Sequence, residues 1–249
     1  ASRTIGNIYA EFGKGGRSGL ELKYDSLLRG QDGVSTRQKV AGQYMNVNNK
    51  EPRDGWNLRT TINIPMQDIV ETALKEMLQK TGAASGTAVL MEVKTGKVKA
   101  ISNLGLTSTG SYQEIQNYAV SDLSEPGSTF KTIAMMAALE EGKIKPNDSV
   151  DTQKGLVRMY GQAMSDHNQE HGGYGKITAA KSIWYSSNIG ISTLIDQAFS
   201  DNPARFVDRL YKMKINQPMD IEIPGAGYPD IPHPKNKNRY WAKTDLPWM

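Results

Sequence analysis

The spacing of hydrophobic and polar positions divides the chain into two regions. Residues 1–57 are rich in glycine and polar residues, and only "LELKYDSLL" has apolar residues at helical spacing, which predicts one short amphipathic helix. "EPRDGWN" has the composition of a linker. From residue 58 the pattern changes to well-defined strands and helices, so we predict that a new unit begins there and spans residues 58–249.

The first part of this larger region predicts a strand, a helix and a hairpin. "LRTTINI" predicts a short strand, and "PMQDIVETALKEMLQKTG" predicts a helix that begins at Pro65 and ends before Gly82. "SGTAVLMEV" and "KVKAISNL" are two strand-like runs, and the tight turn "KTG" between them predicts a β-hairpin.

Helices and polar loops follow. Helices and antiparallel strands therefore occur in separate blocks, which predicts an α+β fold. The expected elements are a helix from about 128 to 141 ended by Gly142, a loop-rich region at 145–176, two helical segments broken near Ser186–Asn188, a helix with Pro203 in its first turn, and a tail rich in proline and glycine at 216–249.

Composition and charge exclude several classes of protein. The 30 Lys and Arg residues against 26 Asp and Glu give a net charge of +4, dispersed and without a basic stripe, which argues against nucleic-acid binding. The lack of cysteine excludes disulfides, thiolate metal sites and a cysteine nucleophile. No run approaches the roughly 18 apolar residues of a membrane helix, and "ASRTIGNIYA" has no signal-peptide pattern.

The stretch "SEPGSTFK" places a serine and a lysine where they would form a catalytic couple. Ser128 begins the predicted helix, and Lys131 lies three residues later on the same face. The helix N-terminus would stabilise an oxyanion at Ser128. Apolar residues downstream would desolvate Lys131 and lower its pKa, so that it acts as the general base that a serine nucleophile needs. Alternatively, Ser128 only caps the helix and the amine reaches water.

A second polar cluster, Ser186-Ser187-Asn188, interrupts the later helical segments. A hydroxyl there would relay a proton between Lys131 and a leaving group, and an amide would orient a peptide carbonyl. The alternative is a polar N-cap on the helix that follows, which accounts for one of the three residues.

"EPGSTFK" followed by "YSSNIG" resembles the transpeptidase domain of class B high-molecular-mass penicillin-binding proteins. "RTIG" and "GRSGLELKYDSLLRGQDG" are similar to the end of that family's non-catalytic pedestal domain, which assigns residues 1–57 to this domain and a linker. "LRTTINIPMQ" and "AVLMEVKTGKVKAISN" are similar to the entry and first hairpin of the transpeptidase domain. The resemblance implies a penicillin-binding/β-lactamase-like α+β fold with an antiparallel sheet and helices.

The resemblance also implies an activity. The protein would be a peptidoglycan D,D-transpeptidase that cross-links stem peptides through a serine acyl-enzyme and binds penicillin covalently. Ser128 would be the nucleophile, Lys131 its general base, Ser186 a proton shuttle and Asn188 a ligand for the substrate peptide.

The family's partners and location follow from the same resemblance. It implies D-Ala-D-Ala stem peptides and β-lactams as ligands, proteins of a cell-division or elongation complex as partners, and no metal or organic cofactor. The family works at the periplasmic face of the inner membrane, tethered by an N-terminal anchor that this chain lacks.

Three further motif matches are better explained by local structure. Lys94-Thr95-Gly96 precedes Ser128, whereas the family's K-T-G follows the S-x-N element, so we assign it to a hairpin turn. Ser200-Asp201-Asn202 is followed by a proline and a helix, which indicates a helix cap. "HNQEH" at His167–His171 spells a zinc-protease pattern, but that pattern needs a helix, and its surroundings are among the least helical here.

The chain ends at "AKTDLPWM" without a K-T-G in the expected place. In the family that motif lies on a strand with an oxyanion-hole donor, whose loss costs about 2.7–4 kcal/mol in comparable acyl-transfer sites. We therefore predict a fragment that lacks the C-terminal strands and is inactive, or nearly so, unless they are supplied. Two alternatives remain: a β-lactamase-like hydrolase or sensor, and a non-catalytic binding module of a cell-wall assembly complex.

Overall fold

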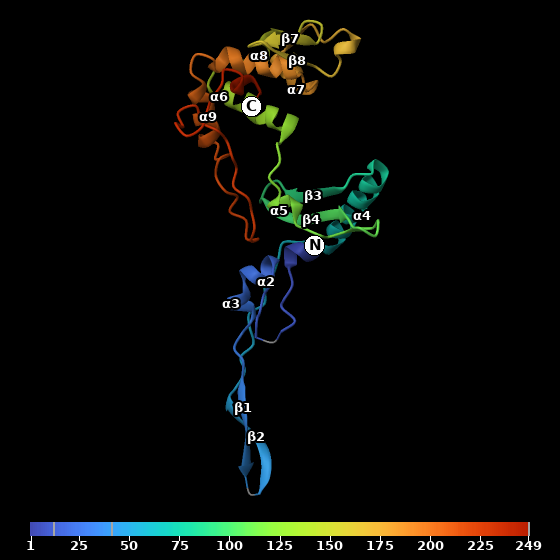
Figure 1. The fold of residues 1–249 in the computed structure, drawn as a ribbon, viewed down its shortest axis with the longest axis vertical. Helices are drawn as coiled ribbons and strands as arrows, with labels where there is room; N and C mark the ends of the chain where they lie inside the picture. The colour runs from blue at the N-terminus through green and yellow to red at the C-terminus, as the bar shows by residue number, and fades with distance from the viewer. Residues whose placement is uncertain (12, 41, 249) are drawn as a thin grey trace. The chain divides into compact units, whose positions relative to one another are not determined.

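The computed structural model describes residues 1–11, 13–40 and 42–248. It has the mixed helical and antiparallel-sheet composition that the sequence predicts, so the α+β assignment is confirmed (Figure 1). The chain forms two compact units, one from Ala1–Asp122 and Met219–Gly227, the other from Leu123–Pro218 and Tyr228–Met249. The boundary predicted at residue 57 lies inside the first unit and stays a prediction.

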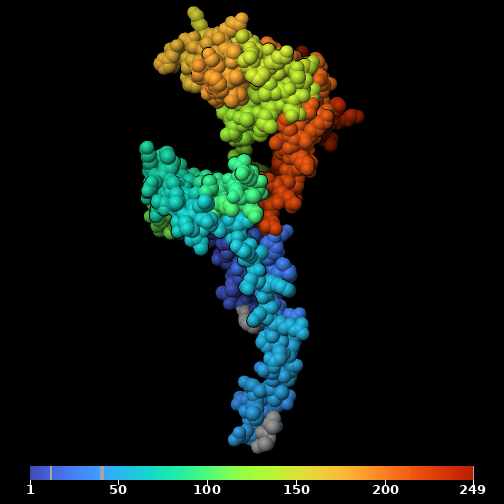
Figure 2. All heavy atoms as spheres, turned by 180° about the vertical axis from the view of Figure 1, so that it is seen from behind, coloured from blue at the N-terminus to red at the C-terminus, as the bar shows by residue number. Residues whose placement is uncertain are grey.

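The N-terminal part of the first unit contains short helices and one two-stranded ribbon. The single helix predicted over "LELKYDSLL" is divided at Tyr24, between the second and third of these helices. Side chains of the second strand of the ribbon are almost all exposed (Figure 2). The elements are α1 (Ser2–Ile5), α2 (Gly19–Lys23), α3 (Asp25–Leu28), β1 (Val34–Val40) and β2 (Gln43–Lys50), with β1 and β2 antiparallel.

The rest of the first unit is a helix packed on a small sheet. The sheet has the order β3-β4-β5, from Ser85–Glu92, Lys97–Leu106 and Tyr112–Gln113, and the short helix α5 (Tyr118–Ser121) follows it. The packed helix is α4 (Ile64–Thr81), whose N-terminus is capped by Asn63 and whose end is marked by Gly82 in the left-handed conformation, so this prediction is confirmed. Gln67 of α4 is buried and bonds both the N–H and the C=O of Ile101 in β4.

The strand predicted over "LRTTINI" is wrong, because residues 58–63 form no strand. The segment makes only two bonds to β4, from the Thr61 hydroxyl to the carbonyl of Val98 at 2.6 Å and from the Asn63 N–H to the carbonyl of Lys99 at 2.8 Å. Gln67 then occupies the next backbone position of β4, so a ladder does not continue.

The hairpin of β3 and β4 is confirmed, and its turn contains Lys94-Thr95-Gly96. Gly96 has φ +68°, the left-handed conformation that glycine supplies at lowest cost. This K-T-G is therefore part of a surface turn, as the sequence analysis assigns it.

The second unit is mainly helical, and its helices confirm the expected pattern. The loop-rich prediction for residues 145–176 is incomplete, because four short strands occur in and beside this region: β6 (Ser149–Asp151), β7 (Leu156–Met159), β8 (Gln162–Ser165) and β9 (Lys176–Thr178). The pairs are β6 with β9 and β7 with β8. The helices are α6 (Phe130–Glu140), α7 (Ala179–Trp184), α8 (Asn188–Phe199), α9 (Pro203–Lys212) and α10 (Asp245–Trp248).

The core of the second unit lies among α6, α8 and α9. Phe199 and Phe206 are almost fully buried, with ring centroids 5.2 Å apart. At the end of α6 the Glu141 carboxylate pairs with Arg209 and Arg205 of α9, and these two guanidinium groups hold the pKa of Glu141 below its usual range. The apolar core and this ion-pair cluster together fix α6, which carries the candidate serine and lysine at its beginning.

Candidate active site

Ser128 lies in a single turn of 3-10 helix, Gly127–Thr129, that leads directly into α6. Gly127, the residue directly before the serine, has φ +56°. This is a left-handed conformation, which glycine adopts at lower cost than other residues. Ser128 is exposed, and within the described residues its hydroxyl makes no hydrogen bond. The alternative in which Ser128 caps the helix is therefore not what the structure has, and the hydroxyl is accessible.

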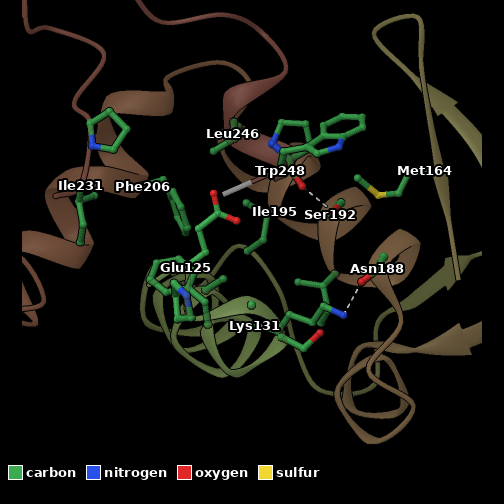
Figure 3. Close-up of a pocket in the computed structure, with 18 of the residues that line it drawn as sticks. Glu125, Lys131, Met164, Asn188, Ser192, Ile195, Phe206, Ile231, Leu246 and Trp248 are labelled. Atoms are coloured by element: carbon green, nitrogen blue, oxygen red, sulfur yellow. Dashed lines mark hydrogen bonds between the residues drawn. The ribbon is translucent and has the colours of Figure 1, made fainter. Parts of the chain in front are cut away.

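Lys131 lies in the first turn of α6 and connects it to the loop between α7 and α8. Its Nζ donates to the carbonyl of Ser186 at 2.7 Å and to the hydroxyl of Ser186 at 3.1 Å. It also donates to Oδ1 of Asn188 at 2.6 Å, the bond drawn between these two residues in Figure 3. The side chain is half-buried, and burial lowers the pKa of Lys131, an effect that the negative charge of Asp166 opposes. The structure thus joins three of the four predicted site residues directly.

The predicted contact between Lys131 and Ser128 is not formed. An ammonium group has three N–H donors, and the three hydrogen bonds of Nζ go to Ser186 and Asn188. Both Ser128 and Lys131 line the same cavity. A neutral amine has two N–H donors and a lone pair, so loss of the proton from Lys131 ends one of these three bonds and frees an acceptor.

The loop between α7 and α8 shows which polar residue is the helix cap. Ser187 is fully buried, and its hydroxyl accepts from the N–H of Gly190 at 2.8 Å. Ser186 has φ +51°, a backbone conformation that residues other than glycine, asparagine and aspartate seldom adopt. The N-cap alternative therefore applies to Ser187, whereas Ser186 and Asn188 face Lys131.

Gly190 allows α7 and α8 to approach closely behind this loop. A Cβ atom at this position would lie 2.5 Å from the Ser182 hydroxyl and 3.0 Å from that of Ser187. A side chain there would displace the cap, so glycine is needed for the close approach.

The cavity has a volume of about 690 Å³ and is bounded by α6, α8, β8 and the C-terminal segment. One wall is polar and contains Ser128, Lys131 and Asn188. Other parts are apolar and include Ile195, Phe206 and Leu246, and Figure 3 shows that Glu125 extends its carboxylate toward them. The lining therefore combines an exposed hydroxyl and a half-buried amine on one wall with apolar surface elsewhere.

Asp166 is a residue of the site that the sequence analysis missed. It follows β8 directly, is only 3% exposed, and accepts from the Ser187 hydroxyl at 2.7 Å and from the Ile189 N–H at 3.1 Å. Its only signal in the sequence is an acidic residue beside the "HNQEH" motif. That motif forms a 3-10 turn at Gln169–His171 rather than an α-helix.

The other motif matches lie outside the cavity lining. Asn202 holds the N-cap position of α9 and Pro203 its first turn, but the side chain of Asn202 makes no capping hydrogen bond, so only the position of the predicted cap is confirmed. Over residues 1–11, 13–40 and 42–248, no cluster of three potential metal-ligating side chains occurs. In the same residues no helix has the length and apolar character to cross a membrane.

Comparison with known proteins gives a consistent family. The family model described as "Penicillin binding protein transpeptidase domain" matches residues 86–238. The chain is 28% identical over 235 residues to the probable peptidoglycan D,D-transpeptidase PbpC of Pseudomonas aeruginosa, and this match covers 90% of the chain. It is 28% identical over 203 residues to the peptidoglycan D,D-transpeptidase FtsI of Escherichia coli, a match that covers 77% of the chain.

Solved structures agree. Penicillin-binding protein 3 of Mycobacterium tuberculosis is similar with a TM-score of 0.75 at 25% identity, over 98% of this chain and 51% of that one. Penicillin-binding protein 2X of Streptococcus thermophilus is similar with a TM-score of 0.74 at 23% identity, over 93% and 36%. The chain spans 40% of the length of PbpC and 33% of that of FtsI.

Proposed function

The chain belongs to the transpeptidase family of penicillin-binding proteins, and on this premise we propose that it forms part of a peptidoglycan D,D-transpeptidase that acts through a serine acyl-enzyme. One observation carries the proposal. Segments 55 or more residues apart bring the amine of Lys131 onto Ser186 and Asn188, in a cavity that Ser128 also lines.

In the proposed reaction the hydroxyl of Ser128 attacks the carbonyl of the penultimate D-Ala of a stem peptide. Neutral Lys131 takes the hydroxyl proton on its lone pair and stays within reach of the Ser186 hydroxyl. Ser186 relays that proton to the amine of the departing D-Ala, and Asn188 orients the peptide. An amine of a second strand then attacks the ester, and Ser128 recovers its proton.

Penicillin acylation of Ser128 tests this proposal. The protein that carries this chain is incubated with penicillin, and its intact mass and peptide map are recorded. We expect one penicilloyl group on the peptide that contains Ser128, because the strained lactam replaces the peptide carbonyl as the target of the same hydroxyl. Ser128→Ala should prevent the adduct, and Ser121→Ala, which removes a hydroxyl before the motif, should not.

An adduct on another residue, or none under saturating penicillin, would contradict the proposal. Residues 1–249 alone form a second arm of the experiment. The prediction that they are inactive by themselves is untested, and stoichiometric acylation of this shorter polypeptide would overturn that prediction while supporting the role of Ser128.

The pH dependence of acylation tests the role of Lys131. Burial lowers the pKa of Lys131 from its ordinary value of 10.5, so the neutral amine becomes available at a lower pH than for a solvated lysine. The acylation rate should therefore rise with pH, with a midpoint below 10.5. It is measured from about pH 6 to about pH 10 after correction for hydrolysis of free penicillin. A flat profile would show that Lys131 is not the base.

We also propose the setting of this activity. The substrate would be the D-Ala-D-Ala end of peptidoglycan stem peptides, the site of action the periplasmic face of the inner membrane, and the partners proteins of cell-wall assembly in division or elongation. The names of the relatives support the peptidoglycan substrate. Nothing in the comparisons favours the binding-module or hydrolase alternatives.

A further inference from the structure

A buried carboxylate behind the loop between α7 and α8 takes no part in the reaction as described. Asp166 is 3% exposed, and among the described residues the hydrogen bonds to its carboxylate come from Ser187 and Ile189 at the start of α8. Burying a carboxylate is costly unless its charge is compensated by hydrogen bonds or nearby positive groups. The backbone of Asp166 is held in place as well, because its N–H donates to the carbonyl of Gly155 at 3.0 Å.

Asp166 bonds the loop at two points. The hydroxyl of Ser187 and the N–H of Ile189 both donate to its carboxylate, so the residues on either side of Asn188 are held by one group. A carboxylate at the first turn of a helix also interacts favourably with the helix dipole. The chain between these two points has little freedom left.

The residue before Asp166 orients the Asn188 amide. Nδ2 of Asn188 donates to the carbonyl of Ser165 at 2.8 Å, which leaves Oδ1 directed to Nζ of Lys131 at 2.6 Å. Ser165 thus holds the middle of this short segment, and Asp166 holds the residues on either side of it. The left-handed backbone of Ser186 directs its carbonyl and hydroxyl to the same amine.

On the proposed function, we infer that Asp166 is a positioning residue of the acylation site. Its carboxylate fixes the 186–188 loop so that three acceptors converge on Lys131, and its negative charge stabilises the ammonium form between turnovers. The alternative is that Asp166 only anchors the start of α8.

Several titratable groups lie near Lys131 and Asp166, and the Glu125 carboxylate lines the same cavity as Lys131. The negative charge of Asp166 raises the pKa of Lys131 against the larger effect of burial. Tyr174 precedes β9, and its pKa is raised by burial and by the same carboxylate. His167 adjoins Asp166 in sequence and lies 2.9 Å from the hydroxyl of Tyr174. In an NMR experiment the signal of Lys131 must therefore be assigned separately from the signals of these groups.

Asp166→Asn tests the inference, because it preserves shape and removes charge. The titration of Lys131 is followed by NMR with lysine labelled at Cε and assigned with Lys131→Arg. We expect the pKa of Lys131 to be lower than in the wild type, since the negative charge of Asp166, which raises it, is lost. The Ile189 amide should exchange roughly ten to a hundred times faster, because it loses a bond to a charged acceptor.

Asp196→Asn is the matched control. Asp196 is also an aspartate bonded to a hydroxyl, that of Tyr160 at 2.8 Å, and it lies on the same helix α8 outside the cavity lining. It should leave both signals unchanged. An unchanged Lys131 titration in Asp166→Asn would overturn the inference, whether or not α8 loses protection.

Ser187→Ala supplies a second test if Asp166→Asn does not fold. It keeps the charge and removes the Ser187 anchor together with the cap bond to Gly190. We expect the Asn188 side-chain amide to lose its distinct, protected signals, while Ser192→Ala, which removes another α8 hydroxyl, should keep them. Unchanged Asn188 signals would overturn the inference. Neither NMR readout requires an active enzyme, so failure of this inference and failure of penicillin acylation are distinguishable.

Discussion

Lys131→Met is expected to slow penicillin acylation by roughly 10²–10⁴-fold, the contribution of a positioned general base. Methionine is unbranched and of similar length, so it fills the space of the lysine stem without an amine. Ser186 and Asn188 are exposed, and their released acceptors can bond water. We therefore expect a large loss of rate with little loss of stability.

The measurement is the second-order rate constant of fluorescent penicillin with the protein that carries the chain. Lys181→Met is a suitable control, because Lys181 is an exposed lysine on α7 and is outside the cavity lining. It should react at the wild-type rate. If Lys131→Met also reacts at that rate, another group deprotonates Ser128 and the proposed mechanism fails.

Phe199→Ala is expected to destabilise the second unit by about 3–5 kcal/mol, the usual cost of removing a buried phenylalanine. Phe199 is fully buried at the end of α8 and packs against Phe206 of α9. The ring joins two helices, so its loss leaves a cavity that neither can easily fill.

Urea unfolding followed by tryptophan fluorescence measures this change. In a Trp56→Phe background the remaining tryptophans all lie in the second unit, at Trp184, Trp241 and Trp248. Met136→Ala on α6 is the control, since Met136 is 50% exposed and should cost far less. Equal shifts in the two variants would show that the core is not where the structure places it.

The helices of this protein were predictable because their signals are local. A proline near the start, a capping side chain and a final glycine define α4 within its own sequence, and the same holds for Pro203 in α9. Strands were less predictable, because pairing depends on partners elsewhere in the chain. "LRTTINI" has strand composition, but Gln67 takes the backbone groups that it would need.

The candidate site also has parts that the local sequence predicts and parts that depend on distant contacts. Ser128 and Lys131 form a short motif, and "SSN" marks a break between helices, so the sequence identifies both. It does not show that the amine of Lys131 prefers Ser186 and Asn188 over Ser128, because that choice depends on a loop 55 residues away. The burial of Asp166 is likewise a product of tertiary packing, in a segment that looks polar and solvated.

Helix α8 serves two purposes at once, and this has an evolutionary consequence. It presents Asn188, Ile191 and Ser192 to the cavity, and it buries Leu194 and Phe199 in the core. On the proposed function, substitutions that reshape the cavity to discriminate between a β-lactam and a stem peptide would therefore often weaken the fold as well. Drug-tolerant variants of such a protein should carry compensating changes in the partners of α8, on α6 and α9, rather than in the cavity alone.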